Sequence, residues 1–171
     1  MNQDPGKKIG QGMLFVSLVL ALILMTWFFG RLEERQHNPN QLPVSTTESH
    51  RVEVILERNK AGHYVTSGTI NGQAVVFLLD TGATDVVIPI NIASKLGLQS
   101  GYKSQAMTAN GPITVYSTEI NQLSIGQINL TDIRASINPE MHSRGILLGM
   151  SALKQIEFTQ QGNKLTLRQY F

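Results

Sequence analysis

An uncharged apolar segment near the N-terminus constrains this chain more than any other feature. The run 13–29 holds 17 residues without a charge, and the flanking Gly12 and Gly30 extend it to 19. As a helix, these residues reach about 28 Å, close to the bilayer hydrocarbon thickness of about 30 Å. No polar stripe divides the run, whereas a helix packed on a globular core would show one. Residues 12–30 are therefore predicted to form a single transmembrane helix after a short N-terminal tail at 1–11.

The alternative to a membrane anchor is a cleaved signal peptide, which has a shorter apolar run followed by small residues. Here the run ends in Trp27-Phe28-Phe29, and bulky rings are typical of the membrane interface. Two lysines precede the span and two arginines follow it, so only the N-terminal amine favours a cytoplasmic N-terminus. We expect an uncleaved single-pass anchor with the rest of the chain outside the cytoplasm, in the periplasm if the source is bacterial.

Composition narrows the function classes that are open to the chain. Apolar residues make up 42% and charged residues 15%, a balance that excludes a wholly disordered protein. The absence of cysteine excludes disulfides, zinc–thiolate sites and a cysteine nucleophile. The net charge is +2 without a basic stripe, so no nucleic-acid partner is expected. The four histidines show no metal-ligand spacing, so we expect neither a metal nor a cofactor.

The region after the apolar run divides into a linker and a mainly β domain. Residues 31–49 are polar, contain two prolines and lack periodicity, which predicts a flexible linker. Residues 50–171 alternate strand-like runs with turns, and Asn71-Gly72 is the strongest hairpin signal among them. One short helix is expected near 91–96, because a glycine follows it at a C-cap position.

The strongest chemical candidate is the tripeptide Asp80-Thr81-Gly82, which is followed by Ala83. The preceding residues 74–79 are apolar on both faces, which predicts a buried strand that ends at the carboxylate. A buried carboxylate without a partner is costly, so few purely structural roles need one, although Asp80 could cap its own turn. A hairpin with Asn110-Gly111 at its tip and a second apolar run ending in Leu148-Gly149 complete the pattern.

In this order of motifs the chain resembles the retropepsins, the retroviral-type aspartic proteases of clan AA, and most of all their membrane-anchored bacterial members. The likeness covers about residues 50–168 and is carried by Asp80-Thr81-Gly82-Ala83, Ile88-Pro89, 108–111 and 147–150. It implies a mainly β, retropepsin-like acid-protease half-barrel with one short helix, preceded by a single transmembrane helix. The family's ion pair between an acidic residue after this turn and an arginine after the second glycine is absent, because Thr84 and Met150 occupy those positions.

The residues and the resemblance together predict a membrane-anchored aspartic endopeptidase. Amide hydrolysis by an activated water needs an acid and a base, and one Asp-Thr-Gly per chain supplies a single carboxyl group. A homodimer in which Asp80 meets Asp80 of the partner subunit provides both groups for a polypeptide substrate. The alternative is a catalytically inactive module of the same fold that dimerises or binds peptides at the membrane. A second alternative is a membrane-tethered structural protein in which Asp80 only closes a turn.

The expected site residues have four roles, with Asp80 as the catalytic residue. The active-site turn and dimer brace are expected at Thr81, Gly82 and Ala83. The flap that folds over an extended peptide is expected at Ala109, Asn110 and Gly111. The wall of the substrate pocket is expected at Ile88, Ile113, Leu148 and Gly149. Two carboxyl groups that share one proton further predict an acidic to mildly acidic pH optimum.

Overall fold

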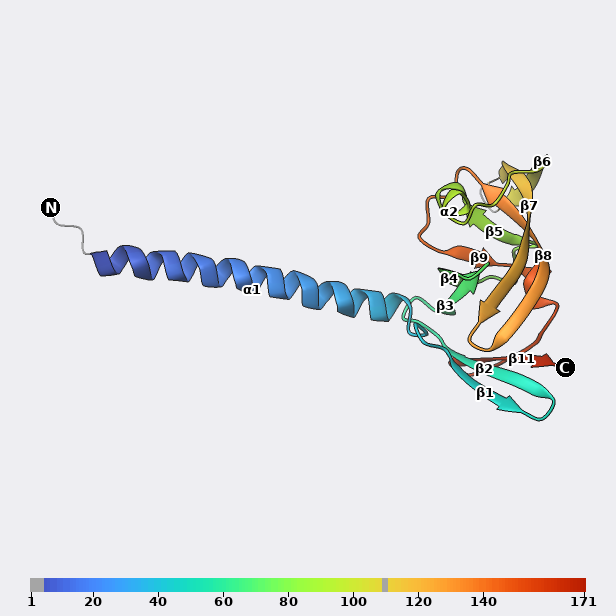
Figure 1. Ribbon diagram of the computed structural model, residues 1–171, viewed down its shortest axis with the longest axis horizontal. Helices are drawn as coiled ribbons and strands as arrows, with labels where there is room; N and C mark the ends of the chain where they lie inside the picture. Colours follow the sequence, from blue (N-terminus) through green and yellow to red (C-terminus); the bar gives the residue numbers. More distant parts are fainter. Residues whose placement is uncertain (1–4, 109–110) are drawn as a thin grey trace. The chain divides into compact units, whose positions relative to one another are not determined.

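The computed structural model describes residues 5–108 and 111–171, which fall into two units (Figure 1). The first unit ends at Gln36 and consists of one helix, whereas the second spans His37–Phe171 and contains the strands. The uncharged, mainly apolar run 13–29 builds the middle of the first unit, and short strand-like runs separated by turns build the second. The expected mainly β fold class, with one long apolar helix before it, is confirmed.

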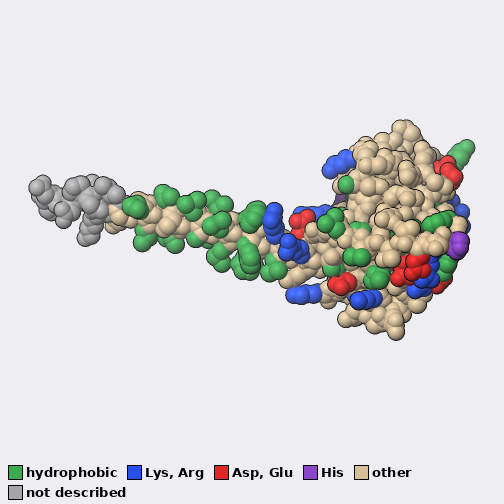
Figure 2. Space-filling view, turned by 60° about the horizontal axis from the view of Figure 1, so that its bottom comes forward, with side chains coloured by type: hydrophobic (Ala, Val, Ile, Leu, Met, Phe, Trp, Pro, Cys, Tyr) green, Lys and Arg blue, Asp and Glu red, His purple; other side chains and the backbone are tan. Residues whose placement is uncertain are grey.

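Helix α1, Pro5–His37, contains the predicted membrane span. Apolar side chains follow one another along its visible face in Figure 2, and Leu22 and Phe28 are 62% and 61% exposed. Near the end of the apolar run, the Arg31 guanidinium lies 4.2 Å from the centroid of the Trp27 ring, a cation–π contact. In the described part of the chain, α1 is the one helix long and apolar enough to cross a membrane. It is compatible with either an anchor or a signal sequence.

Seven strands of the second unit form a sheet that closes on itself. Their order is β3-β4-β9-β5-β8-β7-β6, and β3 also pairs with β7. In the described residues, six of these strands therefore make a closed barrel, and β6 forms a hairpin with β7 beyond it. The strands are β3 Val65–Ile70, β4 Gln73–Leu79, β5 Val86–Pro89, β6 Lys103–Thr108, β7 Gly111–Ile125, β8 Ile128–Asn138 and β9 Ile146–Leu148.

A second sheet is antiparallel and has the order β1-β2-β11-β10. One face buries Val54, Leu56 and Leu167 in the hydrophobic core, which they share with side chains of the barrel. Because side chains alternate along a strand, the opposite face carries Arg168, which pairs with acidic residues of both neighbouring strands. The strands are β1 Val44–Glu48, β2 Arg51–Glu57, β10 Glu157–Gln161 and β11 Lys164–Tyr170.

Turns and short helices connect the strands of the barrel. The predicted hairpin at Asn71-Gly72 is confirmed, and both residues have the positive φ, 49° and 79°, that a two-residue I′ turn requires. Helix α2, Ile90–Lys95, is the predicted short helix, and Gly97 follows it with φ 68°. A further helix, α3 at Met150–Leu153, escapes the sequence analysis because it is one turn long and lacks a side-chain cap.

The segment 31–49, expected to be a flexible linker, contains regular secondary structure. Helix α1 continues to His37, and Val44–Glu48 forms β1, which pairs with β2 along its whole length. The expectation of a flexible segment is therefore wrong for these residues. It fails because β1 is an edge strand whose polar side chains face water, so its sequence shows none of the apolar alternation of a half-buried strand.

Two buried asparagines fasten the segment between α1 and β1 to the barrel. The Asn40 side chain accepts a hydrogen bond from the Glu57 N–H at 2.7 Å and donates to the carbonyls of Glu57 and Val65 at 2.9 and 2.7 Å. The Asn38 side chain accepts from the Asn40 N–H and donates to the Ser67 hydroxyl, both at 3.0 Å. We call residues 38–40 the clasp. Because buried polar groups need partners, these bonds make the clasp part of the folded domain.

Candidate active site

Asp80 lies where two parallel strands end side by side. Strand β4 ends at Leu79, which is paired with Leu148 of β9. The Leu79 N–H donates to the Tyr64 carbonyl at 3.0 Å, and the Asp80 N–H donates to the Leu148 carbonyl at 3.1 Å. Neighbouring strands therefore hold the backbone on both sides of the carboxylate. Asp80 is half-buried, as expected, but β4 is not the buried strand that its apolar sequence predicts, because Phe77 is its one buried residue.

The turn after β4 is closed by the carboxylate at its start. Asp80 Oδ1 accepts a hydrogen bond from the Gly82 N–H at 2.9 Å, and the Ala83 N–H donates to the Asp80 carbonyl at 3.2 Å. A Cβ on Gly82 would lie 3.2 Å from Asp80 Oδ1, so a side chain there would crowd the carboxylate. Thr81 is exposed at the surface of this turn. The four residues predicted for the catalytic turn thus lie together, and their roles stay predictions.

Helix α3 clamps this turn from the end of β9. Its first two N–H groups donate to the carbonyls of Ala83 and Thr84 at 2.8 and 2.9 Å. Gly149 lies so close to the turn that a Cβ there would be 2.1 Å from the Asp85 carbonyl oxygen. A side chain cannot fit at that distance, which explains why the second apolar run ends in glycine. Gly149, predicted as a pocket wall, is buried and contacts the turn through its backbone.

An ion pair ties the strand after the turn to β8. Asp85 Oδ1 lies 2.7 Å from Arg134 Nε. The Ser151 hydroxyl connects the same elements, because it accepts from the Val86 N–H at 3.0 Å and donates to the Arg134 carbonyl at 2.7 Å. The ion pair that the family resemblance implies is absent here, and this pair braces the start of β5 from a different strand. Sequence reasoning missed it because Arg134 is distant in the chain and belongs to no motif.

Two of the predicted wall residues face the core instead of an open surface. Ile88 and Leu148 have no exposed area and belong to the hydrophobic core. Because successive residues of a strand point to opposite faces, their neighbours Val87 and Leu147 occupy the other face. These two are half-buried and lie opposite one another across β5 and β9. We therefore replace Ile88 and Leu148 by Val87 and Leu147 as candidates for the wall.

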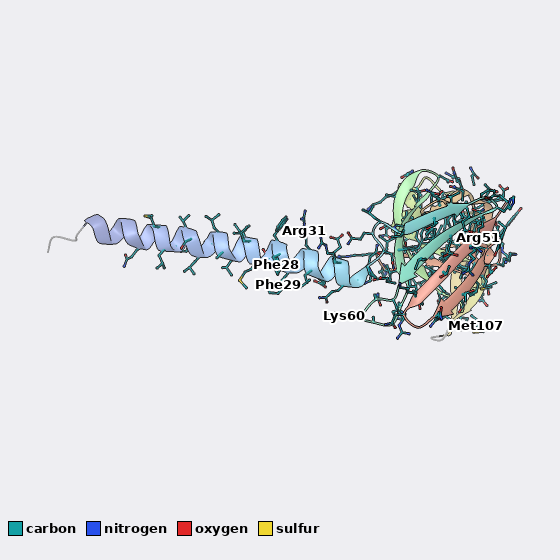
Figure 3. All side chains as sticks on the ribbon, turned by 90° about the horizontal axis from the view of Figure 1, so that it is seen from below. Phe28, Phe29, Arg31, Arg51, Lys60 and Met107 are labelled. Atoms are coloured by element: carbon teal, nitrogen blue, oxygen red, sulfur yellow. The ribbon has the colours of Figure 1, made fainter. Side chains whose placement is uncertain are left out.

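The hairpin of β6 and β7 corresponds to the predicted flap. The first residues of β7 pair with β6 alone, so the hairpin extends beyond the barrel. Gly111 has φ 107°, and Ile113 is half-buried. Met107, labelled in Figure 3, is 82% exposed on β6. Ala109 and Asn110, the other predicted flap residues, lie outside the described residues.

A comparison with protein families identifies this arrangement. The model of the family described as "gag-polyprotein putative aspartyl protease" matches residues 66–155, more than half of the chain. The matched range includes the Asp80 turn, the β6–β7 hairpin and Gly149. The chain belongs to the retropepsin-like aspartic proteases. The family membership that the motifs predicted is therefore confirmed, and aspartic protease chemistry is supported at the level of the family.

Two solved structures are similar to this chain. A retropepsin-like aspartic protease from Rickettsia conorii is 28% identical, with a TM-score of 0.62, over 74% of this chain and 96% of that chain. EIAV protease complexed with the inhibitor HBY-793 is 22% identical, with a TM-score of 0.45, over 56% of this chain and 89% of that chain. The Rickettsia conorii structure, covered almost completely, confirms the retropepsin-like fold.

Curated sequences of two bacterial proteins are also similar. An uncharacterized protein in the cobV 5′ region of Sinorhizobium sp. is 28% identical over 173 residues, which are 95% of this chain and 74% of the relative. The uncharacterized protein RP867 of Rickettsia prowazekii (strain Madrid E) is 30% identical over 117 residues, which are 61% of this chain and 46% of the relative. The Sinorhizobium match extends well beyond the range of the family model.

Proposed function

We propose that this retropepsin-like protein is a membrane-anchored aspartic endopeptidase that acts as a homodimer. Family membership supports peptide-bond hydrolysis at a general level. The observation that carries the catalytic assignment is the position of Asp80. It is half-buried at the ends of the parallel strands β4 and β9, and the backbone on both sides is hydrogen-bonded to neighbouring strands. This setting holds a carboxylate in one orientation, as catalysis requires.

The dimer supplies the second carboxyl group that the chemistry needs. Two carboxyl groups about 3 Å apart cannot both ionise, so they share one proton. The ionised Asp80 takes a proton from the attacking water, and the protonated Asp80 of the partner subunit donates to the carbonyl oxygen of the scissile bond. The Gly82 N–H, 2.9 Å from Oδ1, orients the carboxylate. Thr81, exposed beside it, is placed to brace the turn against the partner subunit.

An extended peptide would bind between the barrel and the flap. Val87 and Leu147 offer half-buried apolar surface next to the turn, and Ile113 offers similar surface from the flap. An extended peptide can pair its backbone with a strand edge, so β6 and β7 would add hydrogen bonds along it. Closing the flap would exclude water from the reacting bond.

Helix α1 supports a single-pass anchor at residues 12–30. The proposed position of the protease domain outside the cytoplasm rests on the N-terminal amine alone, because two basic residues lie on each side of the span. We place the start of that domain at the clasp instead of residue 50, because Asn38 and Asn40 are bonded to its strands. Confinement to a membrane raises the effective concentration of the two subunits, which favours their association.

Replacing Asp80 by asparagine tests the catalytic assignment. The Asp80→Asn variant keeps the shape of the side chain but cannot take part in proton transfer, so digestion of an unfolded polypeptide should fall about 100-fold or more. The thermal unfolding midpoint should change little, because an amide oxygen can still accept from the Gly82 N–H.

The matched control is Asp132→Asn on β8. Asp132 is exposed and has φ 54°, a conformation that asparagine tolerates as well as aspartate does. This variant should digest the polypeptide at the unaltered rate. Equal rates for the Asp80 variant and this control would contradict the catalytic role of Asp80. No digestion by the unaltered protein would favour an inactive peptide-binding or dimerisation module.

A further inference from the structure

The loop between β2 and β3 is bonded to the residue at which helix α1 ends. The Asn59 side chain donates to the His37 carbonyl at 2.9 Å. The same side chain accepts from the N–H groups of Ala61 and His63 at 3.0 and 2.9 Å, which holds the loop in one conformation. His37 therefore has a fixed neighbour in the protease domain, in addition to the clasp that follows it.

The hydrogen bonds of the clasp fix the backbone between the His37 carbonyl and strand β3 of the barrel. Asn38 directly follows His37, and its amide donates to the Ser67 hydroxyl of β3 at 3.0 Å. Asn40 lies two residues after Asn38, and its carbonyl accepts a hydrogen bond from the Ser67 N–H at 3.0 Å. A flexible tether would allow the loop to move far from the end of α1, but these bonds keep the two together.

Chain length limits how far this loop can lie from a membrane that contains α1. Trp27, Phe28 and Phe29 end the apolar run, and such rings are typical of the hydrocarbon edge. The eight residues from Phe29 to His37 rise about 12 Å as a helix. Headgroups extend roughly 5–8 Å beyond the hydrocarbon on each side of a bilayer. At most about 12 Å of helix therefore separates the hydrocarbon edge from His37, so the loop bonded to His37 is within reach of the headgroups.

The exposed charges of this loop are basic. Arg58 and Lys60 flank Asn59, and both side chains are exposed (Lys60 is labelled in Figure 3). Among the described residues, the ion pairs found involve neither of them. On the helix just before His37, Arg31 and Arg35 add two further cationic groups beside two glutamates. Cationic side chains at headgroup depth attract anionic phospholipids.

We propose that the β2–β3 loop binds anionic lipid headgroups through Arg58 and Lys60. The inference rests on the proposed membrane anchoring and adds a second contact between the protein and the bilayer. A domain held at two points keeps a constant face towards the membrane. Two such domains can then form a two-fold dimer only about an axis along the membrane normal, because both copies share one membrane surface.

Site-specific labels test this contact, and the absence of cysteine makes single labels unambiguous. The full chain is reconstituted in phosphatidylcholine vesicles with about one quarter phosphatidylglycerol. A fluorophore at Ala61→Cys should be quenched by a headgroup nitroxide at least about twofold more than one at Ser104→Cys on β6. Equal quenching at the two positions overturns the proposal.

A label inside the span separates failure of this inference from failure of the anchor. A fluorophore at Leu20→Cys should be quenched by a nitroxide on the lipid acyl chains. If it is quenched while Ala61 and Ser104 labels behave alike, the anchor stands and the loop contact is refuted. If it is not quenched, both the anchoring and the loop contact are refuted.

A separate comparison tests whether the positive charges of Arg58 and Lys60 are needed for the loop to contact the lipid. The double change Arg58→Gln and Lys60→Gln should reduce quenching of the Ala61 label by about twofold or more in the anionic vesicles, and not in pure phosphatidylcholine. Changing Lys95 and Lys154 to glutamine removes the same charge from other exposed positions and should leave the signal unchanged. An unchanged signal in the loop variant contradicts recognition by Arg58 and Lys60.

Discussion

At the scale of single residues, the alternation of side chains decides which of them a substrate can touch. Leu147 and Leu148 are neighbours of the same type on β9, yet one is half-buried on the open face and the other has no exposed area. Their mutational effects should therefore separate binding from folding. The pair is a matched experiment, because the chemical change is identical at both positions.

We expect Leu148→Ala to destabilise the protein by about 2–5 kcal/mol, because it leaves a cavity in the core. Leu147→Ala should cost less stability and should change KM or the preferred cleavage sites instead. Urea unfolding and digestion of a peptide mixture measure the two effects. Our replacement of Leu148 by Leu147 in the pocket wall would be wrong if Leu147→Ala left cleavage unchanged.

At the scale of elements, the clasp connects the ends of β2 and β3 through one side chain. Asn40 satisfies an N–H and a carbonyl of Glu57 and the carbonyl of Val65. Asn40→Ala leaves buried groups without partners, so we expect a loss of about 2–4 kcal/mol in the free energy of unfolding. Asn91→Ala, at an exposed position of α2, should change stability by less than about 0.5 kcal/mol. Similar values for both variants in urea unfolding would show that the clasp contributes little.

Charged side chains on the outer face of the four-stranded sheet make a pH-dependent contribution to the free energy of unfolding. The Tyr170 hydroxyl and the Arg168 guanidinium, each 2.9 Å from the carboxylate, lower the pKa of Glu157 below its ordinary value. Hydrogen bonds to Glu53 and then Glu157 raise the pKa of Arg168. Because the pKa of Glu157 is lower in the folded than in the unfolded chain, its contribution is present above the unfolded value of about 4.3. That contribution is lost as the pH falls through the folded value.

Glu157→Gln should therefore make stability less sensitive to acid. Between about pH 7 and pH 3, the variant should lose less of its free energy of unfolding than the unaltered protein does. Glu140→Gln removes an exposed carboxylate outside this sheet and serves as the control. Urea titrations at both pH values give the comparison, and identical pH dependence in all three proteins would argue against the role of this hydrogen-bonded carboxylate.

At the scale of the whole molecule, one chain presents one Asp80 turn, so the proposed enzyme needs two copies. Mixing the unaltered protein with an equal amount of Asp80→Asn protein tests this requirement. If every active site needs two intact carboxyl groups, random pairing leaves about one quarter of the activity that the unaltered protein shows at the same total protein concentration. Independent subunits would retain about one half. The unfolded subunits are mixed and refolded together, so that exchange is complete before digestion is measured.

The sequence alone determined the apolar helix, the mainly β class, the Asn71-Gly72 hairpin and the Asp80 turn. Each of these depends on neighbouring residues: an unbroken apolar run, a two-residue turn or a strand that ends at a carboxylate. Only the tertiary structure decided that Leu147 and not Leu148 is open, since runs that are apolar on both faces do not reveal which face is covered. Contacts between segments that are far apart in the chain could not be predicted from the sequence either. The bonds of Asn40 to β2 and β3, and of Asp85 to Arg134, arise from pairing that no local pattern encodes.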